Sequence, residues 1–173
     1  MLALFLGVCA AGRADVEAVS AVEPQQNTKI DISKMTREEM YAPVENPQSI
    51  KDFFVNNLFA AAKKVKNEYN GTKGQQSELA GLLESQAIYC KINNEYAFFS
   101  GALNSSFEKE LAVGGTEVAK NVASKVISTR LPEIQNYPVE QKLAGEFTAV
   151  VTLSLHSAIE ARAEKLKLAS DNK

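Results

Sequence analysis

His156 is the single histidine of the chain and the first residue to consider for chemistry. In the helix that the pattern predicts there, Thr152 and Glu160 lie one turn away on either side. A histidine with a glutamate four residues on can supply half of a carboxylate metal site in a helical bundle. Such sites need several inward-facing pairs of this kind, and no second histidine exists. The sequence therefore favours a surface histidine paired weakly with Glu160, and it predicts no metal ligand set.

Acid–base and nucleophilic catalysis find little support in the residue pattern. Serines and aspartates are present, but no motif such as G-x-S-x-G presents a serine as a nucleophile. The acidic pairs Glu38-Glu39 and Glu108/Glu110 fit solvated helix faces better than the paired carboxylates of a glycosidase. We therefore expect no catalytic residue, and we keep an enzyme of unknown class only as the last alternative.

Phosphate and nucleic-acid binding are also disfavoured. Gly114-Gly115 precedes a predicted helix N-terminus, where backbone N–H groups can bind an anion. No third glycine and no Lys-Ser/Thr pair accompanies them, so a plain loop is the stronger interpretation. The net charge of −2 gives no basic stripe for nucleic acid and no polybasic membrane attachment. No cofactor is expected.

The chain contains two cysteines, Cys9 and Cys90. If residues 1–14 are removed, Cys90 remains alone and no intramolecular disulfide is possible. Its apolar neighbours favour a buried, inert thiol over a reactive one. Glycosylation sequons at Asn70 and Asn104 matter only if the chain follows eukaryotic secretion.

The N-terminal residues 1–14 have the form of an export signal. An apolar run from Leu2 to Ala11 ends in small side chains, and a polar stretch follows. A run of roughly ten residues is too short for a membrane span, which needs roughly 20. No basic residue precedes the run, so the alternative is a retained apolar helix that packs on the body. The sequence Leu6-Gly7-Val8-Cys9 resembles the lipidation motif of bacterial lipoproteins, but Val8 occupies the position of a small residue. Lipidation at Cys9 is therefore disfavoured.

Residues 15–47 resemble an extended arm with no sustained hydrophobic period. Thr36 and Glu39 form a T-x-x-E capping box, which predicts one short helical turn near 37–41. Pro43 and Pro47 then stop it. The arm is expected either to stay mobile or to lie along a surface.

The first long helix is expected over about 48–69. Asn46-Pro47 is typical of a helix start, because asparagine caps well and proline suits the first helical position. Asn70-Gly71 is a natural stop. Its apolar face follows helical spacing and comprises Ile50, Phe54, Leu58, Val65 and Tyr69.

Residues 76–113 allow two interpretations. Apolar residues continue at helical spacing through the whole stretch, whereas residues 87–99 also resemble two short strands around an Asn93-Asn94 turn. The helical ladder keeps its phase through this turn, so a helix that ends at Gly114-Gly115 is favoured.

Two further helices complete the pattern. Thr116 caps one that ends at Leu131-Pro132, and Pro138 can lie in the first turn of the last, over about 138–168. The prediction is therefore an all-α fold: an up-and-down four-helix bundle over 48–170, preceded by an extended N-terminal arm. This plan is similar to that of extrinsic proteins of the thylakoid lumen, a similarity of architecture without a shared motif.

The expected function is that of a non-catalytic, exported helical subunit or adaptor that docks on a larger protein assembly in the periplasm or a lumen. The expected location is the thylakoid lumen, the periplasm or the exterior after secretion, peripheral to a membrane and without a span of its own. The alternative is a helical carrier of a small apolar ligand such as a lipid or pigment. Aromatic and methionine side chains outside the main apolar faces are the candidate partner or ligand surface: Met35, Met40, Tyr41, Phe53, Phe59 and Phe98.

Overall fold

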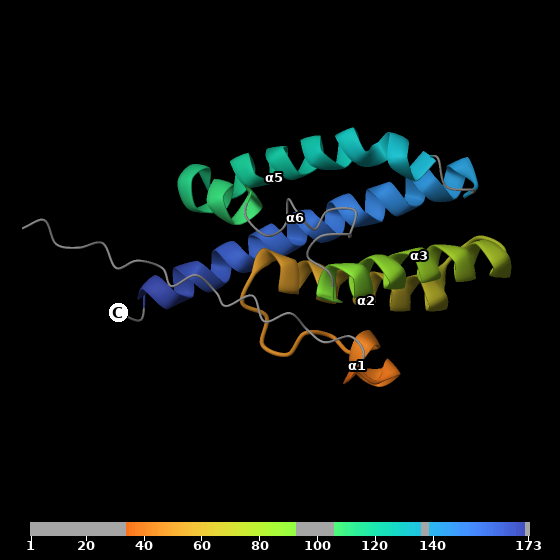
Figure 1. Ribbon diagram of the computed structural model, residues 1–173. Helices are drawn as coiled ribbons and strands as arrows, with labels where there is room; N and C mark the ends of the chain where they lie inside the picture. Colours follow the sequence, from red (N-terminus) through yellow and green to blue (C-terminus); the bar gives the residue numbers. More distant parts are fainter. Residues whose placement is uncertain (1–33, 93–105, 136–138, 172–173) are drawn as a thin grey trace, which may run out of the picture. The chain divides into compact units, whose positions relative to one another are not determined.

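The computed structural model describes residues 34–92, 106–135 and 139–171, and these residues form helices and no strand. The all-α prediction is confirmed. None of the described helices is both long enough and apolar enough to cross a membrane. In chain order the helices are α1 (Arg37–Tyr41), α2 (Ile50–Glu68), α3 (Lys73–Ile92), α5 (Ser106–Gln135) and α6 (Gln141–Asp171) (Figure 1).

Two capping boxes fix the starts of α1 and α2. The Thr36 hydroxyl accepts the N–H of Glu39, whose carboxylate in turn accepts the N–H of Thr36, so the predicted short helix is confirmed. For α2 the cap is Ser49, paired in the same way with Asp52. The predicted start at Asn46-Pro47 is therefore wrong, because a reciprocal box satisfies two backbone donors where asparagine alone would satisfy one.

The stretch from 76 to 113 is divided. Helix α3 begins at Lys73 and ends at Ile92, and α5 begins at Ser106. Residues 87–92 are helical, which favours helix over hairpin for that half. The remainder of the proposed hairpin, and the sequon at Asn104, lie outside the described residues.

Helix α5 consists of two helical segments that meet at the glycine pair, where a helix was expected to end. Gly115 alone departs from helical geometry, with φ 80° and ψ −176°, and the chain resumes its helix on the far side. A kink at Gly115 thus separates residues 106–114 from residues 116–135, in agreement with the predicted helix boundary at Gly114-Gly115. At its other end α5 reaches Gln135, beyond the expected stop at Leu131-Pro132. Pro132 therefore lies in the last turn of the helix, where it removes one helical hydrogen bond.

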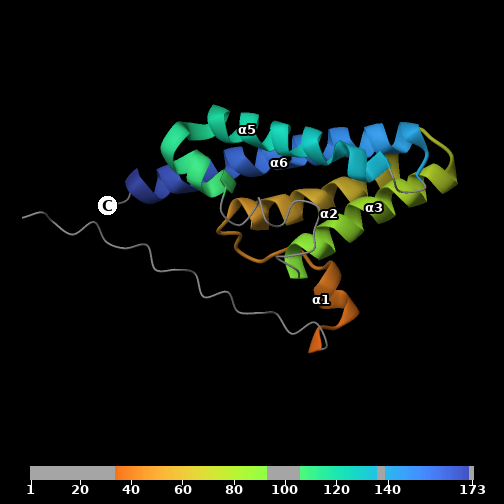
Figure 2. The same ribbon diagram turned by 45° about the horizontal axis from the view of Figure 1, so that its top comes forward.

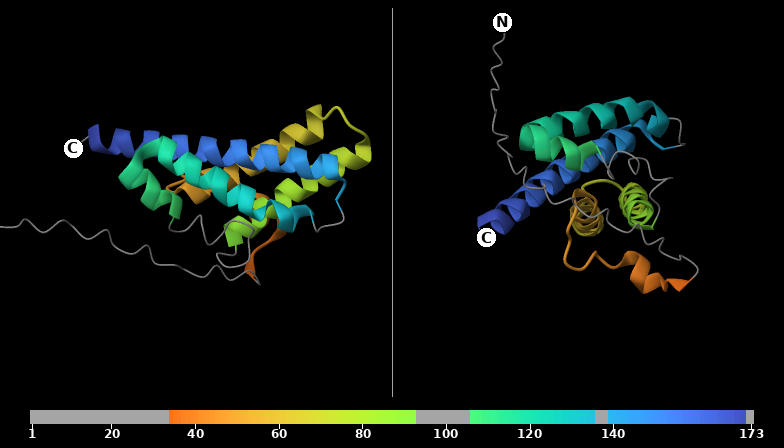
Figure 3. Two further views of the ribbon diagram at one scale, coloured as in Figure 1. Left: turned by 90° about the horizontal axis from the view of Figure 1, so that it is seen from above. Right: turned by 60° about the vertical axis from the view of Figure 1, so that its left-hand side comes forward.

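The four long helices run up and down. Gln76 near the start of α3 donates to the carbonyls of Val65 and Lys66 near the end of α2. Tyr69, just after α2, bonds to Glu146 near the start of α6, and Lys120 in the first half of α5 pairs with Glu160 in the second half of α6. Figures 1 and 2 show α6 between α5 and the α2–α3 pair, and the right panel of Figure 3 shows α2 and α3 side by side. The up-and-down bundle is thus as predicted.

Helix α6 occupies the centre of the packing. It contacts α2, α5 and α3, whereas α3 and α5 do not pack closely against each other along their described lengths. The largest fully buried side chains come from all four helices, and they are Ile50, Phe54, Val55, Leu58, Leu79, Leu83, Phe107, Leu143, Leu155 and Ile159.

Candidate functional site

Helices α2 and α6 leave an open groove between them on the surface of the bundle. Its volume is about 520 Å³. Both walls come from helical residues one or two turns apart, so each wall is a single helix face. The lining residues are Asn57, Ala60, Ala61, Lys64, Val65 and Glu68 of α2, the C-cap residue Tyr69, and Val150, Leu153, Ser154 and Ser157 of α6.

Small side chains create the groove, and one large apolar side chain stands at its edge. Ala60 and Ala61 on α2 face Ser154 and Ser157 on α6 across it, so neither wall fills the space. Leu153 is 67 % exposed, which is unusual for a leucine in the middle of a helix of this bundle. The groove is therefore suited to receive apolar side chains from another molecule.

Polar contacts hold the two walls at a fixed spacing. The Asn57 amide donates to the backbone carbonyl of Ser154 at 2.9 Å, and the Tyr69 hydroxyl donates to the Glu146 carboxylate at 2.5 Å. The hydrogen bond to Glu146 is the main reason why the pKa of Tyr69 is raised to about 12. Because these bonds lie along the antiparallel helix pair, the groove is built before any ligand arrives.

The lining offers binding and little chemistry. Its titratable groups are Lys64, Glu68 and Tyr69, and neither a histidine nor a cysteine reaches it. Across the described residues, no group of three or more histidine, cysteine, aspartate or glutamate side chains could hold a metal ion. The groove can bury apolar surface and offer a charged rim.

His156 lies away from the groove, where α6 meets α5. Its Nε2 atom is 2.9 Å from the Ser124 hydroxyl, and Glu160 is paired with Lys120. The expected pairing of His156 with Glu160 is therefore wrong, because α5 covers this face and supplies nearer partners. A serine beside a histidine resembles a nucleophile with its base. However, Ser124 lies inside a helix, where the backbone N–H groups needed for an oxyanion hole are already bonded.

The predicted surface residues are distributed over several places. Met35 and Met40 are half-buried, and the ring of Tyr41 in α1 lies 5.7 Å from the Arg37 guanidinium. Phe53 and Phe59 are partly buried and pack against the core. Helical spacing places Phe53 one turn before Asn57, on the groove side of α2, and it places Phe59 on another face. Phe98 lies outside the described residues, so a role for this set stays a prediction.

Cys90 is buried at 1 % exposure, as its apolar neighbours predicted. Burial is the main reason why the pKa of its thiol is raised to about 12, and a hydrogen bond from the Gln86 amide opposes the shift. At neutral pH the group is a protonated thiol inside the core, which is the unreactive form.

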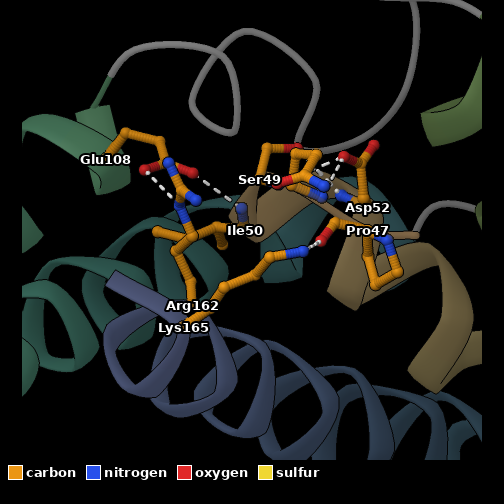
Figure 4. Close-up of polar contacts among 8 residues, drawn as sticks. Pro47, Ser49, Ile50, Asp52, Glu108, Arg162 and Lys165 are labelled. Atoms are coloured by element: carbon orange, nitrogen blue, oxygen red, sulfur yellow. Dashed lines mark hydrogen bonds and ion pairs between the residues drawn. The ribbon is translucent and has the colours of Figure 1, made fainter. Parts of the chain in front are cut away.

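Glu108 differs most from its expected role as part of a solvated face. One carboxylate oxygen accepts the backbone N–H of Ile50 at 2.7 Å, and the other accepts from Arg162 at 3.2 Å (Figure 4). Beside this pair, Lys165 donates to the carbonyl of Pro47 at 2.6 Å. The start of α2, the start of α5 and the last part of α6 are thus joined by one polar cluster.

Comparison with family models, with curated proteins and with solved structures found no match. The sequence contained a signal for the groove in the small residues at helical spacing on 57–68 and 150–157, but such residues equally mark a close helix–helix contact. Only the packing of α2 against α6 tells the two apart.

Proposed function

We propose that this chain is a non-catalytic helical subunit or adaptor that docks on a partner protein through the groove between α2 and α6. The observation that carries the proposal is Leu153, which stands exposed beside a groove lined by small side chains. An exposed leucine next to a preformed apolar hollow is a common arrangement at protein–protein contacts.

The partner element that fits best is an amphipathic helix. A helix laid in a groove between two others inserts apolar residues spaced three and four apart, and small residues in the walls allow close approach. Lys64 and Glu68, one turn apart on the rim, can pair with an acidic and a basic residue of that helix. These charges would determine the direction in which the partner helix binds more than the affinity with which it binds.

A carrier of a small apolar ligand is the second candidate. A volume of about 520 Å³ lies within the range of small-molecule sites. Native mass spectrometry of protein from its natural source separates the two functions. A bound small mass that is lost on Leu153→Asp supports the carrier, and a stable larger assembly supports the adaptor.

We also propose that residues 1–14 direct the chain across a membrane, to the periplasm or a lumen. The support is the apolar run followed by small residues in the sequence. N-terminal sequencing of the native protein tests it. A mature terminus between residues 12 and 15 supports export, and an intact Met1 contradicts it.

The docking test uses two exposed apolar residues on different faces. Leu153→Asp places a charge in the groove, and Val113→Asp places the same charge on α5, where Val113 is 81 % exposed. A photo-reactive residue at Ser157 reports what lies in the groove in native extracts. We expect cross-linking to one protein, abolished by Leu153→Asp and retained with Val113→Asp. Equal loss in both variants, or cross-linking unaffected by either, contradicts docking at the groove.

A further inference from the structure

The segment before α2 is held on the bundle through its own backbone. The side-chain amide of Asn56 accepts the N–H of Val44 at 2.6 Å and donates to the carbonyl of Val44 at 3.0 Å. The Lys91 ammonium donates to the carbonyls of Glu39 and Ala42 at 2.6 and 2.7 Å. From here on, the arm means residues 34–45 of the segment 15–47 that was expected to be an extended arm. The cradle means Asn56 together with Lys91.

The arm owes its conformation to the cradle. Helix α1 has five residues and no buried side chain, and an isolated helix of that length is not stable in water. The Val44 side chain packs against the hydrophobic core, as a partly buried neighbour. The arm is therefore a docked segment, and the cradle is a binding site for an extended stretch with a helical turn before it.

A residue with left-handed backbone joins the arm to the bundle. Asn46 has a φ of 50°, in the left-handed region that side chains other than asparagine and aspartate rarely adopt. Just beyond it, Lys165 holds the side chain of Asn46 and the carbonyl of Pro47 on the bundle side. The chain thus changes direction at one residue, between two firmly held parts.

We propose that the arm exchanges between two copies of this chain, each arm docking on the cradle of the other copy. Opening at Asn46 would let this residue take extended backbone, and every arm contact would be remade between chains. Exchange of an identical element is a low-cost route to a dimer, and a short hinge favours it.

A second copy is the occupant that fits because the cradle already matches this sequence. Asn56 forms two hydrogen bonds with the backbone of Val44, and these need an extended residue at that place. Lys91 donates to the carbonyls of Glu39 in α1 and of Ala42 just after it, which needs a helix end. The core beneath accepts the side chain of a valine. Docking within one chain has a high effective concentration, so exchange should appear only as protein concentration rises. The proposal does not depend on the groove between α2 and α6.

The hinge provides the first test, by light scattering after size exclusion over micromolar to millimolar concentrations. The monomer has a mass of 18.8 kDa. Asn46→Val disfavours the left-handed backbone and should lower the dimer dissociation constant by about tenfold or more. Asn46→Gly favours it and should leave the chain monomeric. Both changes avoid the core, so folding should be retained. Equal masses for the two variants at all concentrations would overturn the proposal.

Complementation provides the second test, with full-length chains. One variant loses the cradle through Asn56→Ala with Lys91→Ala, and the other spoils the arm through Val44→Pro, which removes the N–H given to Asn56. Each alone should be monomeric, and the mixture should give a one-to-one heterodimer in native mass spectrometry, because the intact arm meets the intact cradle. A mixture that stays monomeric overturns exchange. If each variant alone still forms a dimer and Leu153→Asp abolishes that dimer, the contact lies in the groove between α2 and α6. This result also overturns the exchange of arms.

Discussion

The Glu108 carboxylate accepts the backbone N–H of Ile50 at 2.7 Å, across 58 positions of the chain. Ile50 is the first residue of α2, so the carboxylate lies at the positive end of that helix dipole. The same carboxylate binds Arg162 of α6. One side chain of α5 therefore completes the cap of α2 and ties it to α6.

Removal of this carboxylate should destabilise the protein clearly. Glu108→Ala leaves a half-buried N–H and the Arg162 guanidinium without their partner, which should cost about 2 kcal/mol of unfolding free energy. Glu110→Ala is the matched control on the same helix and should change stability by less than about 0.5 kcal/mol. Urea unfolding followed by circular dichroism measures both. Equal effects of the two substitutions would show that the contacts of Glu108 do not contribute to the free energy of unfolding.

Two glycines, one at the kink in α5 and one inside α6, should respond in opposite ways to substitution by alanine. Gly115 has a backbone that only glycine adopts readily, so Gly115→Ala should destabilise by about 2 kcal/mol. Gly145 lies inside α6 with nothing within 4 Å of an added Cβ, so Gly145→Ala should stabilise by about 0.5–1 kcal/mol. Thermal melts of both variants test this. A stabilising Gly115→Ala would mean that α5 is straight in solution.

The bond between Tyr69 and Glu146 predicts a pH effect at the end of the groove. The pKa of Tyr69 is raised to about 12 from 10, which means that folding favours the protonated hydroxyl. Its stabilising contribution is complete below pH 10 and is lost as the pH rises toward 12. The difference in ultraviolet titration between wild type and Tyr69→Phe isolates this tyrosine. A difference curve centred at pH 10 would contradict the bond.

Burial of Cys90 predicts a thiol that reacts only after unfolding. The raised pKa, about 12, leaves almost no thiolate at neutral pH, and exposure of 1 % denies access to reagents. In a Cys9→Ser background, a disulfide reagent should label native protein far more slowly than urea-unfolded protein. Rapid labelling of the native chain would show that the α3 end opens readily.

Local signals predicted the all-α class, the short helix α1 and the end of α2 before Asn70-Gly71, because capping boxes and glycine stops act over three or four residues. Thr36 with Glu39 shows this well. An error came where two local signals competed, because the capping box of Ser49 with Asp52 starts α2 in place of Asn46-Pro47. The glycine pair did mark a boundary, since Gly115 separates two helical segments of α5. The same residue types suit both outcomes, and only the packed helices decide.

The functional features were harder to predict because each depends on two segments far apart in sequence. The groove needs the small residues of α2 to meet those of α6, and the partner of His156 is Ser124, 32 positions away. In the sequence, Glu108 cannot be distinguished from an exposed acidic residue, because its partners Ile50 and Arg162 lie on α2 and α6. A periodic pattern assigns a residue to a face and leaves open what that face meets.

The central place of α6 has a consequence for how the protein is made. The ribosome completes α2, α3 and α5 before α6, yet α6 is the helix that all three contact, and α3 and α5 do not pack closely against each other. The α2–α3 hairpin can form early, while the apolar face of α5 waits for a partner. The contacts that α2, α3 and α5 make with α6 therefore cannot form until α6 has emerged from the ribosome.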